Sequence, residues 1–126
     1  MRVLVVEDDF FIADDLATIL EQHGASVMGP ISNSGDALDL LGSHRPDCAL
    51  LDVNLAGEMA FGLAAALKSS DVPFLFITGY DRQALPEGFA DVAILNKPFT
   101  GPILIEAIER LLVPPIAINR GPAPSR

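Results

Sequence analysis

Acidic, hydroxyl and amine side chains stand at the ends of four short apolar runs in this sequence. Glu7-Asp8-Asp9 follows the run Arg2–Val6, and Asp52 closes a second apolar run. Thr78 closes a third run, and Lys97 comes shortly after a fourth. Carboxylates gathered with one ammonium and one hydroxyl group are suited to binding a divalent cation together with an anionic group.

A magnesium ion resolves the crowding of these carboxylates. Neighbouring carboxylates repel one another, and without compensation at least one is driven toward protonation. Mg²⁺ takes oxygen ligands and is commonly held by one or two carboxylates plus a phosphate. We expect Asp8 and Asp52 to be its direct ligands. With the metal bridging it to a phosphoryl group, Asp52 can act as a nucleophile, while Lys97 and Thr78 hold the transferred oxygens.

These positions share one edge if the apolar runs are parallel strands of a single sheet. Strands that alternate with helical patterns predict an α/β fold with a doubly wound parallel sheet. Ligands of such sheets bind beyond the carboxyl ends of the strands. Three of the predicted strands, Arg2–Val6, Cys48–Leu51 and Phe74–Thr78, are continuously apolar, so we expect them at the centre of the sheet. The five predicted strands are Arg2–Val6, Ser26–Ile31, Cys48–Leu51, Phe74–Thr78 and Val92–Leu95.

Apolar residues at helical spacing fill the segments between the strands. The second helix is predicted over Ser34–His44, with Asn33 or Ser34 as its N-cap, and the third over Phe61–Lys68. The last begins near Thr100-Gly101-Pro102, where the threonine can cap it. The first helix buries Ile12, Leu16, Ile19 and Leu20. The last buries Leu104, Ile105, Ile108, Leu111 and Leu112.

Two segments break this pattern. Pro86 and Gly88 interrupt Gly79–Asp91, so we expect a shortened fourth helix of one turn there, in a mobile segment. Residues 113–126 hold four prolines and no periodicity, which predicts an extended or disordered tail. Residues 1–112 are therefore expected to form one domain.

The composition and net charge of the chain limit the classes of partner that it is expected to bind. The chain has 126 residues, 50% of them hydrophobic, and a formal net charge of −9, with every acid inside residues 1–112. Nucleic acid is a poor partner because its phosphates need clustered cations. We expect a cytoplasmic protein, because no apolar stretch could span a bilayer and no targeting signal is visible. Cys48 has no partner in the chain and is expected to be a buried thiol.

Three motifs together resemble the receiver domain of bacterial two-component response regulators. They are Val3–Asp9, Asp47–Leu55 and Asn96–Thr100. The match covers residues 1–112 in order, spacing and strand context. It implies a flavodoxin-like fold with strand order 2-1-3-4-5. It also implies a signalling domain, not an enzyme, in which Asp52 receives a phosphoryl group from a histidine kinase.

The resemblance assigns a role to each site residue. Glu7 and Asp8 become the acidic pair, with Asp8 a direct Mg²⁺ ligand, Glu7 acting through water, and Asp9 only a neighbour. Asn54 would offer its backbone carbonyl to the metal. Thr78 would offer its hydroxyl to the phosphoryl group and Lys97 its charge. The peptide before Pro98 is expected to be cis.

A narrower resemblance links Val72–Tyr80 and Asp52–Glu58 to the FAT-GUY group, single-domain receivers of alphaproteobacteria that take or divert phosphoryl groups. Ile77 stands at the alanine position of that signature. Tyr80 and Asn54 occupy positions that tune phosphoryl lifetime in receivers. Ile94 replaces the aromatic switch residue of many receivers, and Ala56 replaces a usual proline. With Ala56 at that position and the fourth helix broken at Pro86, we expect the usual output face, made of the fourth helix, fifth strand and fifth helix, to be altered.

The expected partners are a histidine kinase and, as a further candidate, a histidine phosphotransfer protein. Kinase contact is expected near Phe11, Asp14 and Asp15 and in the loop after Pro98. Output is expected through protein–protein interaction or as a phosphate sink, from a monomer or weak homodimer.

Several alternatives stay open at this point. A receiver-like adaptor that is not phosphorylated keeps the fold without the chemistry. A Mg²⁺-dependent phosphatase of the haloacid dehalogenase type would want a second aspartate where Asn54 stands. A flavodoxin would need a phosphate-binding loop where Glu7-Asp8-Asp9 stands. Taken singly, Asp8 or Asp9 could cap the first helix, and Lys97 could form a surface ion pair.

Overall fold

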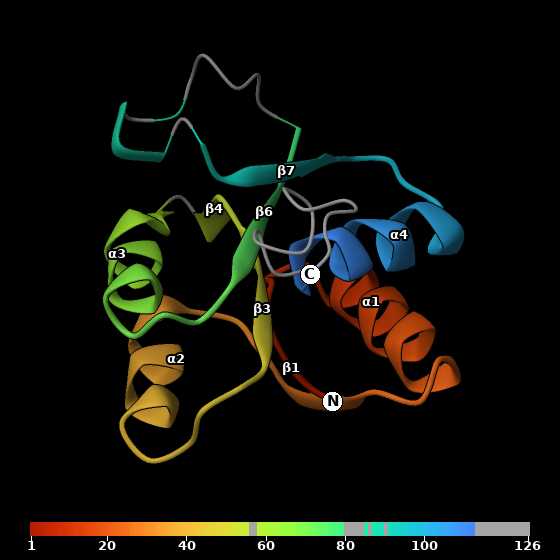
Figure 1. The fold of residues 1–126 in the computed structure, drawn as a ribbon, viewed down its shortest axis with the longest axis horizontal. Coiled ribbons are helices and arrows are strands. Elements are labelled where there is room, and N and C mark those ends of the chain that lie inside the picture. The colour runs from red at the N-terminus through yellow and green to blue at the C-terminus, as the bar shows by residue number, and fades with distance from the viewer. Residues whose placement is uncertain (56–57, 80–84, 86, 90, 113–126) are drawn as a thin grey trace, which may run out of the picture.

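The computed structural model describes residues 1–55, 58–79, 85, 87–89 and 91–112. Five parallel strands form one sheet in the order β2-β1-β3-β6-β7, with α1 and α4 on one face and α2 and α3 on the other (Figure 1). The strands are β1 (Arg2–Val6), β2 (Ser26–Ile31), β3 (Cys48–Asp52), β6 (Phe74–Thr78) and β7 (Ala93–Asn96). The helices are α1 (Phe10–Gln22), α2 (Ser34–Leu41), α3 (Phe61–Ser69) and α4 (Gly101–Leu112). Counted along the sheet, this is the predicted flavodoxin-like order 2-1-3-4-5.

The three central strands are buried on both faces, as their apolar runs predict. In β1, Val3 and Val5 pack toward α1 and α4, whereas Leu4 and Val6 pack toward α2 and α3. Every residue of β3 and β6 is buried. Cys48 is among them, and its burial raises the pKa of its thiol to about 11, so it stays neutral at physiological pH.

The strand register brings the site residues to one edge. Val6 of β1 lies beside Leu51, and Asp52 lies beside Ile77 of β6. Thr78 in turn lies beside Asn96, the last residue of β7. The chain therefore leaves four neighbouring strands at nearly the same level, which places the following residues close together.

The first helix starts at a side-chain cap and is followed by a glycine two residues after its last residue. Asp9 is its N-cap, and its Oδ1 accepts hydrogen bonds from Phe11 N at 2.9 Å and Ile12 N at 3.1 Å. Gly24 follows the helix at φ +85°, where a residue with a Cβ would be strained. Leu16 and Leu20 are buried as predicted.

Other helix boundaries differ slightly from the predictions. α2 ends at Leu41, not His44, because Gly42 is a poor helix former and the chain turns there. Asn33 is its N-cap, accepting a hydrogen bond from Asp36 N at 2.8 Å. At the start of α4, Thr100 Oγ1 accepts from Ile103 N at 3.4 Å. Leu112, predicted to be buried, is exposed because it is the last residue of that helix.

The connection between β6 and β7 holds only a short helix among its described residues. This is the 3-10 helix η2 (Glu87–Phe89), in agreement with a shortened fourth helix. Residues 80–84, 86 and 90 lie outside the described part, so the predicted mobility and the position of Tyr80 lie outside it too. The same holds for the tail 113–126.

Three further features complete the described chain. A two-stranded antiparallel pair, β4 (Asn54–Leu55) and β5 (Glu58–Met59), follows β3 and was not predicted. The Lys97-Pro98 peptide is cis, as the resemblance implies, and so is Gly29-Pro30. Within the described ranges, no helix has the length and apolarity to cross a bilayer.

The N-cap of α1 gives a first prediction. Asp9→Ala is expected to lower the free energy of unfolding by about 1 kcal/mol, because two backbone N–H groups lose their acceptor. Asp9→Asn keeps the acceptor oxygen and should lose less. Urea unfolding of the three proteins measures the difference. Equal stability of Asp9→Ala and the unaltered chain would contradict the capping role.

Candidate functional site

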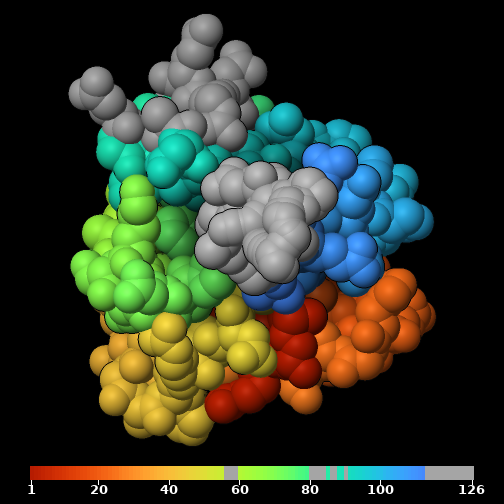
Figure 2. Space-filling view, in the orientation of Figure 1, coloured from red at the N-terminus to blue at the C-terminus, as the bar shows by residue number. Residues whose placement is uncertain are grey.

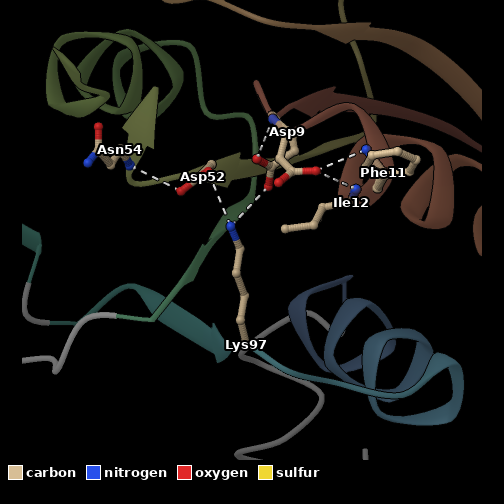
Figure 3. A network of polar contacts seen from close by, with 7 residues as sticks. Asp9, Phe11, Ile12, Asp52, Asn54 and Lys97 are labelled. Carbon is tan, nitrogen blue, oxygen red and sulfur yellow. Dashed lines mark hydrogen bonds and ion pairs between the residues drawn. The ribbon is translucent and has the colours of Figure 1, made fainter. Parts of the chain in front are cut away.

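The ammonium group of Lys97 contacts carboxylates at the ends of two strands. Lys97 Nζ lies 3.2 Å from Glu7 Oε1 and 3.2 Å from Asp52 Oδ2 (Figure 3). Glu7 follows β1, Asp52 ends β3, and Lys97 follows β7. The lysine side chain therefore reaches along the edge of the sheet, past β6, to meet both carboxylates.

Asp8 completes an acidic cluster. One carboxylate oxygen from each of Glu7, Asp8 and Asp52 lies within 4.8 Å of the others. Glu7 and Asp52 are buried, whereas Asp8 is exposed. The structure thus brings together the three acids that the sequence predicted as metal residues, with one face of the cluster open to solvent.

The environment of Glu7 in the cluster raises the pKa of its carboxyl group. Its burial, then its closeness to Asp52, raise the pKa of Glu7 to about 7, although Asp9 N and Lys97 act in the opposite direction. Asp9 N donates to Glu7 Oε2 at 3.0 Å. The other oxygen, Oε1, is buried and accepts no hydrogen bond within the described part of the chain, so Lys97 meets it only as an ion-pair partner.

Lys97 remains charged in this setting. Burial opposes its charge, but attraction to Asp52 and Glu7 outweighs burial and raises the pKa of Lys97. One ammonium group faces three carboxyl groups. The cluster therefore keeps an excess of acid over base when the carboxyl groups are ionised.

Both oxygens of Asp52 are engaged. Oδ2 accepts from Lys97 Nζ at 3.2 Å, and Oδ1 accepts from Asn54 N at 3.1 Å. The second contact was not predicted, although aspartate often accepts from the backbone two residues ahead and the sequence holds that signal. It orients the Asp52 carboxylate between β3 and β4, which the lysine alone would not do.

The remaining predicted residues are placed as follows. Thr78 is buried at the end of β6, and its carbonyl accepts from Lys97 N at 3.0 Å. Asp9 uses its side chain to cap α1 and lies outside the acidic cluster. Tyr80 and Ala56 fall outside the described residues.

The donor set fits a magnesium ion. Its potential ligands are carboxylate oxygens, which Mg²⁺ prefers, and they come from adjacent strand ends. A buried Glu7 oxygen without a hydrogen bond is also suited to contact a water molecule bound to such an ion. The exposed position of Asp8 leaves room for the waters that Mg²⁺ retains.

Comparison with known proteins identifies the family of this chain. A family model described as the response regulator receiver domain matches residues 3–109. The solution structure of SdrG from Sphingomonas melonis Fr1 has a TM-score of 0.79 and 36% identity, covering 90% of this chain and 97% of that one. A response regulator receiver protein from Burkholderia phymatum has a TM-score of 0.76 and 30% identity, covering 88% and 94%.

Curated relatives are longer. The transcriptional regulatory protein PdtaR of Mycobacterium tuberculosis is 32% identical over 112 residues, which are 86% of this chain and 55% of PdtaR. The chain thus spans about half the length of curated relatives that it matches. The region that the family model matches, residues 3–109, contains all the strand ends described above. The chain belongs to the response regulator receiver domain family.

Proposed function

We propose that this chain accepts a phosphoryl group on Asp52 from the phosphohistidine of a histidine kinase, in a reaction that requires Mg²⁺. The observation that supports the proposal is the cluster of Asp52 with Glu7, Asp8 and Lys97 at the carboxyl edge of the sheet. An Asp52 oxygen forms a bond to phosphorus while the phosphorus–nitrogen bond of the donor breaks. The electron pair of that bond stays on the leaving imidazole.

Each residue of the cluster has a proposed part. Asp8 and Asp52 hold Mg²⁺ directly, Glu7 holds it through water, and the Asn54 carbonyl is a further ligand. The ion supplies the positive charge that lets an anionic carboxylate meet an anionic phosphoryl group. Lys97 and the Thr78 hydroxyl hold the transferred oxygens.

The proposal includes how the domain is used. Residues 1–112 act as a stand-alone receiver, with 113–126 as a tail. Output runs through protein–protein interaction, or the chain serves as a phosphate sink. Coverage of 97% of SdrG supports a receiver of this size. The alternative is a receiver-like adaptor without phosphorylation.

The donor is proposed to dock beside α1. Phe11 is 78% exposed at the start of this helix. A hollow of about 520 Å³ lies between α1 and the loop after β7, and Asp15, Lys97 and Pro98 are among its lining residues. A donor seated there brings its phosphohistidine to the side of the site where Lys97 meets Asp52. A histidine kinase or a histidine phosphotransfer protein fits this role.

The proposal predicts one phosphoryl group per chain. Incubation with acetyl phosphate and Mg²⁺ should add one phosphoryl mass in intact-protein mass spectrometry, and none with EDTA. Asp52→Asn should abolish the addition, because it replaces the nucleophilic carboxylate by an amide. Asp9→Asn, a neighbouring acid outside the cluster, is the matched control and should retain it. Labelling by neither acetyl phosphate nor a panel of kinases would favour the adaptor.

Magnesium should stabilise the fold. At a hundredfold excess over Kd, a ligand that binds only the folded chain raises the free energy of unfolding by about 2.7 kcal/mol. Thermal unfolding with Mg²⁺ and with EDTA measures this effect. Asp8→Asn should remove most of it, since a direct ligand loses its charge. Equal melting temperatures of the unaltered chain in both buffers would count against the metal site.

The docking surface should matter for a kinase but not for a small donor. Phe11→Ala is expected to slow transfer from the cognate kinase about tenfold, as loss of an exposed aromatic contact does at interfaces. Labelling by acetyl phosphate should stay unchanged. The control is Leu38→Ala, a change of an exposed apolar residue on α2. Equal slowing with both donors would place the effect of Phe11 at the site and not at docking.

A further inference from the structure

A small apolar hollow lies between α1 and α4, at the edge of the sheet opposite the acidic cluster. It has a volume of about 160 Å³, and Leu20 and Ile108 are buried residues in its wall. Met1, which precedes β1, lines it as well, so the hollow lies at the amino ends of the strands. In Figure 2 the blue end of α4 meets the red start of the chain and the orange residues near the end of α1. This surface is therefore separate from the candidate site.

Apolar side chains at the rim of this hollow are left in contact with solvent. Met1 is 51% exposed and Leu112 is 36% exposed, although both line the hollow. An apolar cavity of roughly 150 Å³ can take a group the size of benzene. The hollow is thus large enough for an aliphatic side chain, and covering its rim would remove further apolar surface from water.

The sequence that follows α4 has the composition to fill this hollow. Residues 113–118 read Val-Pro-Pro-Ile-Ala-Ile, without a charged or hydrogen-bonding side chain. Since α4 ends at Leu112, which itself lines the hollow, the segment starts at the rim. The proline at its second position disfavours continuation of the helix and favours a change of direction there. One residue of extended chain spans about 3.3 Å, so Ile116 and Ile118 are within reach of the hollow.

Two further features favour docking of this segment. Its two prolines have a restricted φ, so fewer conformations are lost when the segment becomes ordered. Opposite charge also attracts the tail to the domain, because residues 113–126 carry two arginines and no acid, whereas residues 1–112 hold all 17 acids. Glu109 lines the hollow and forms no ion pair within the described part of the chain. Arg120, two residues after Ile118, has the charge to pair with it.

We propose that residues 113–118 dock in the hollow between α1 and α4 of the same chain, with Ile116 and Ile118 as apolar anchors. Side chains two residues apart lie on the same side of an extended chain, so Ala117 faces away from the hollow. The docked segment ties the end of α4 to the end of α1 and to the start of β1. It covers the exposed rim, which makes this surface unavailable to a partner protein, and it leaves the acidic cluster open.

Substitutions in the segment test the proposal in the full chain. Ile116→Asp should lower the Tm by about 4 °C, because a charged group does not enter an apolar hollow and the burial of the isoleucine is lost. Ala117→Asp is the matched control. It adds the same charge one position away and should leave the Tm unchanged. Equal melting temperatures of the two variants would overturn the proposal.

Nuclear Overhauser contacts between methyl groups give the position of the segment directly. In the unaltered full chain we expect contacts from Ile116 and Ile118 to Leu20 and Ile108, and none from Ala117. Absence of contacts from the two isoleucines would overturn the proposal. Contacts seen only between differently labelled copies in a mixed sample would overturn it as well, because the segment would then dock on a second copy.

Labelling by acetyl phosphate separates this surface from the acidic cluster. Ile116→Asp should be labelled at the same rate as the unaltered chain, since the hollow and the cluster lie at opposite edges of the sheet. A changed rate in Ile116→Asp, with Ala117→Asp unaffected, would place the segment at the cluster and would overturn its docking in the hollow.

Discussion

The ion pair of Lys97 with Glu7 and Asp52 is the interaction on which the site depends. Carboxyl groups from two strand ends are buried beside a third, and a single ammonium group lies between them. Burial keeps the pKa of Glu7 near 7 even with the lysine in contact. The protein itself therefore leaves the site incompletely neutralised, and a cluster of this kind could hold a divalent cation.

The three consecutive acids Glu7, Asp8 and Asp9 have different positions and contacts in the fold. Glu7 points into the cluster, Asp8 stays exposed beside it, and Asp9 caps α1. This division follows from where β1 ends and α1 begins, since only a residue in extended conformation just before the helix can serve as N-cap. The parallel order of β1, β3, β6 and β7 then brings Asp52, Thr78 and Lys97 to the same edge.

Much of this could be predicted because apolar runs and polar strand ends are local patterns. The bounds of β1, β2 and β6 follow from their sequences alone, and the acids, Thr78 and Lys97 follow from the ends of the strands. Contacts that depend on tertiary packing could not be predicted. For example, Lys68 of α3 lies with its Nζ 5.6 Å from the centre of the Phe89 ring in η2. This contact joins two separate elements, and no sequence periodicity indicates it.

Smaller errors have similar causes. The β4–β5 pair is two residues long in each strand, too short for an alternating pattern to appear. The end of α2 was misplaced because the backbone keeps turning through Gly42 and Ser43 after the helix ends. The Asn54–Asp52 hydrogen bond had a sequence signal, the side chain of an aspartate two residues earlier, but its use in orienting the acceptor required the geometry.

The claim that Asp52 accepts a phosphoryl group is tested most directly by a structure of crystals grown with Mg²⁺ and the phosphoryl analogue BeF3⁻. The account predicts beryllium attached to an Asp52 oxygen, Mg²⁺ on Asp8 and Asp52 with the Asn54 carbonyl as a further ligand, and fluorine atoms contacting Lys97 and Thr78. Lys97 still bridging Glu7 and Asp52, with the metal and beryllium absent from the cluster at saturating concentrations, would contradict it.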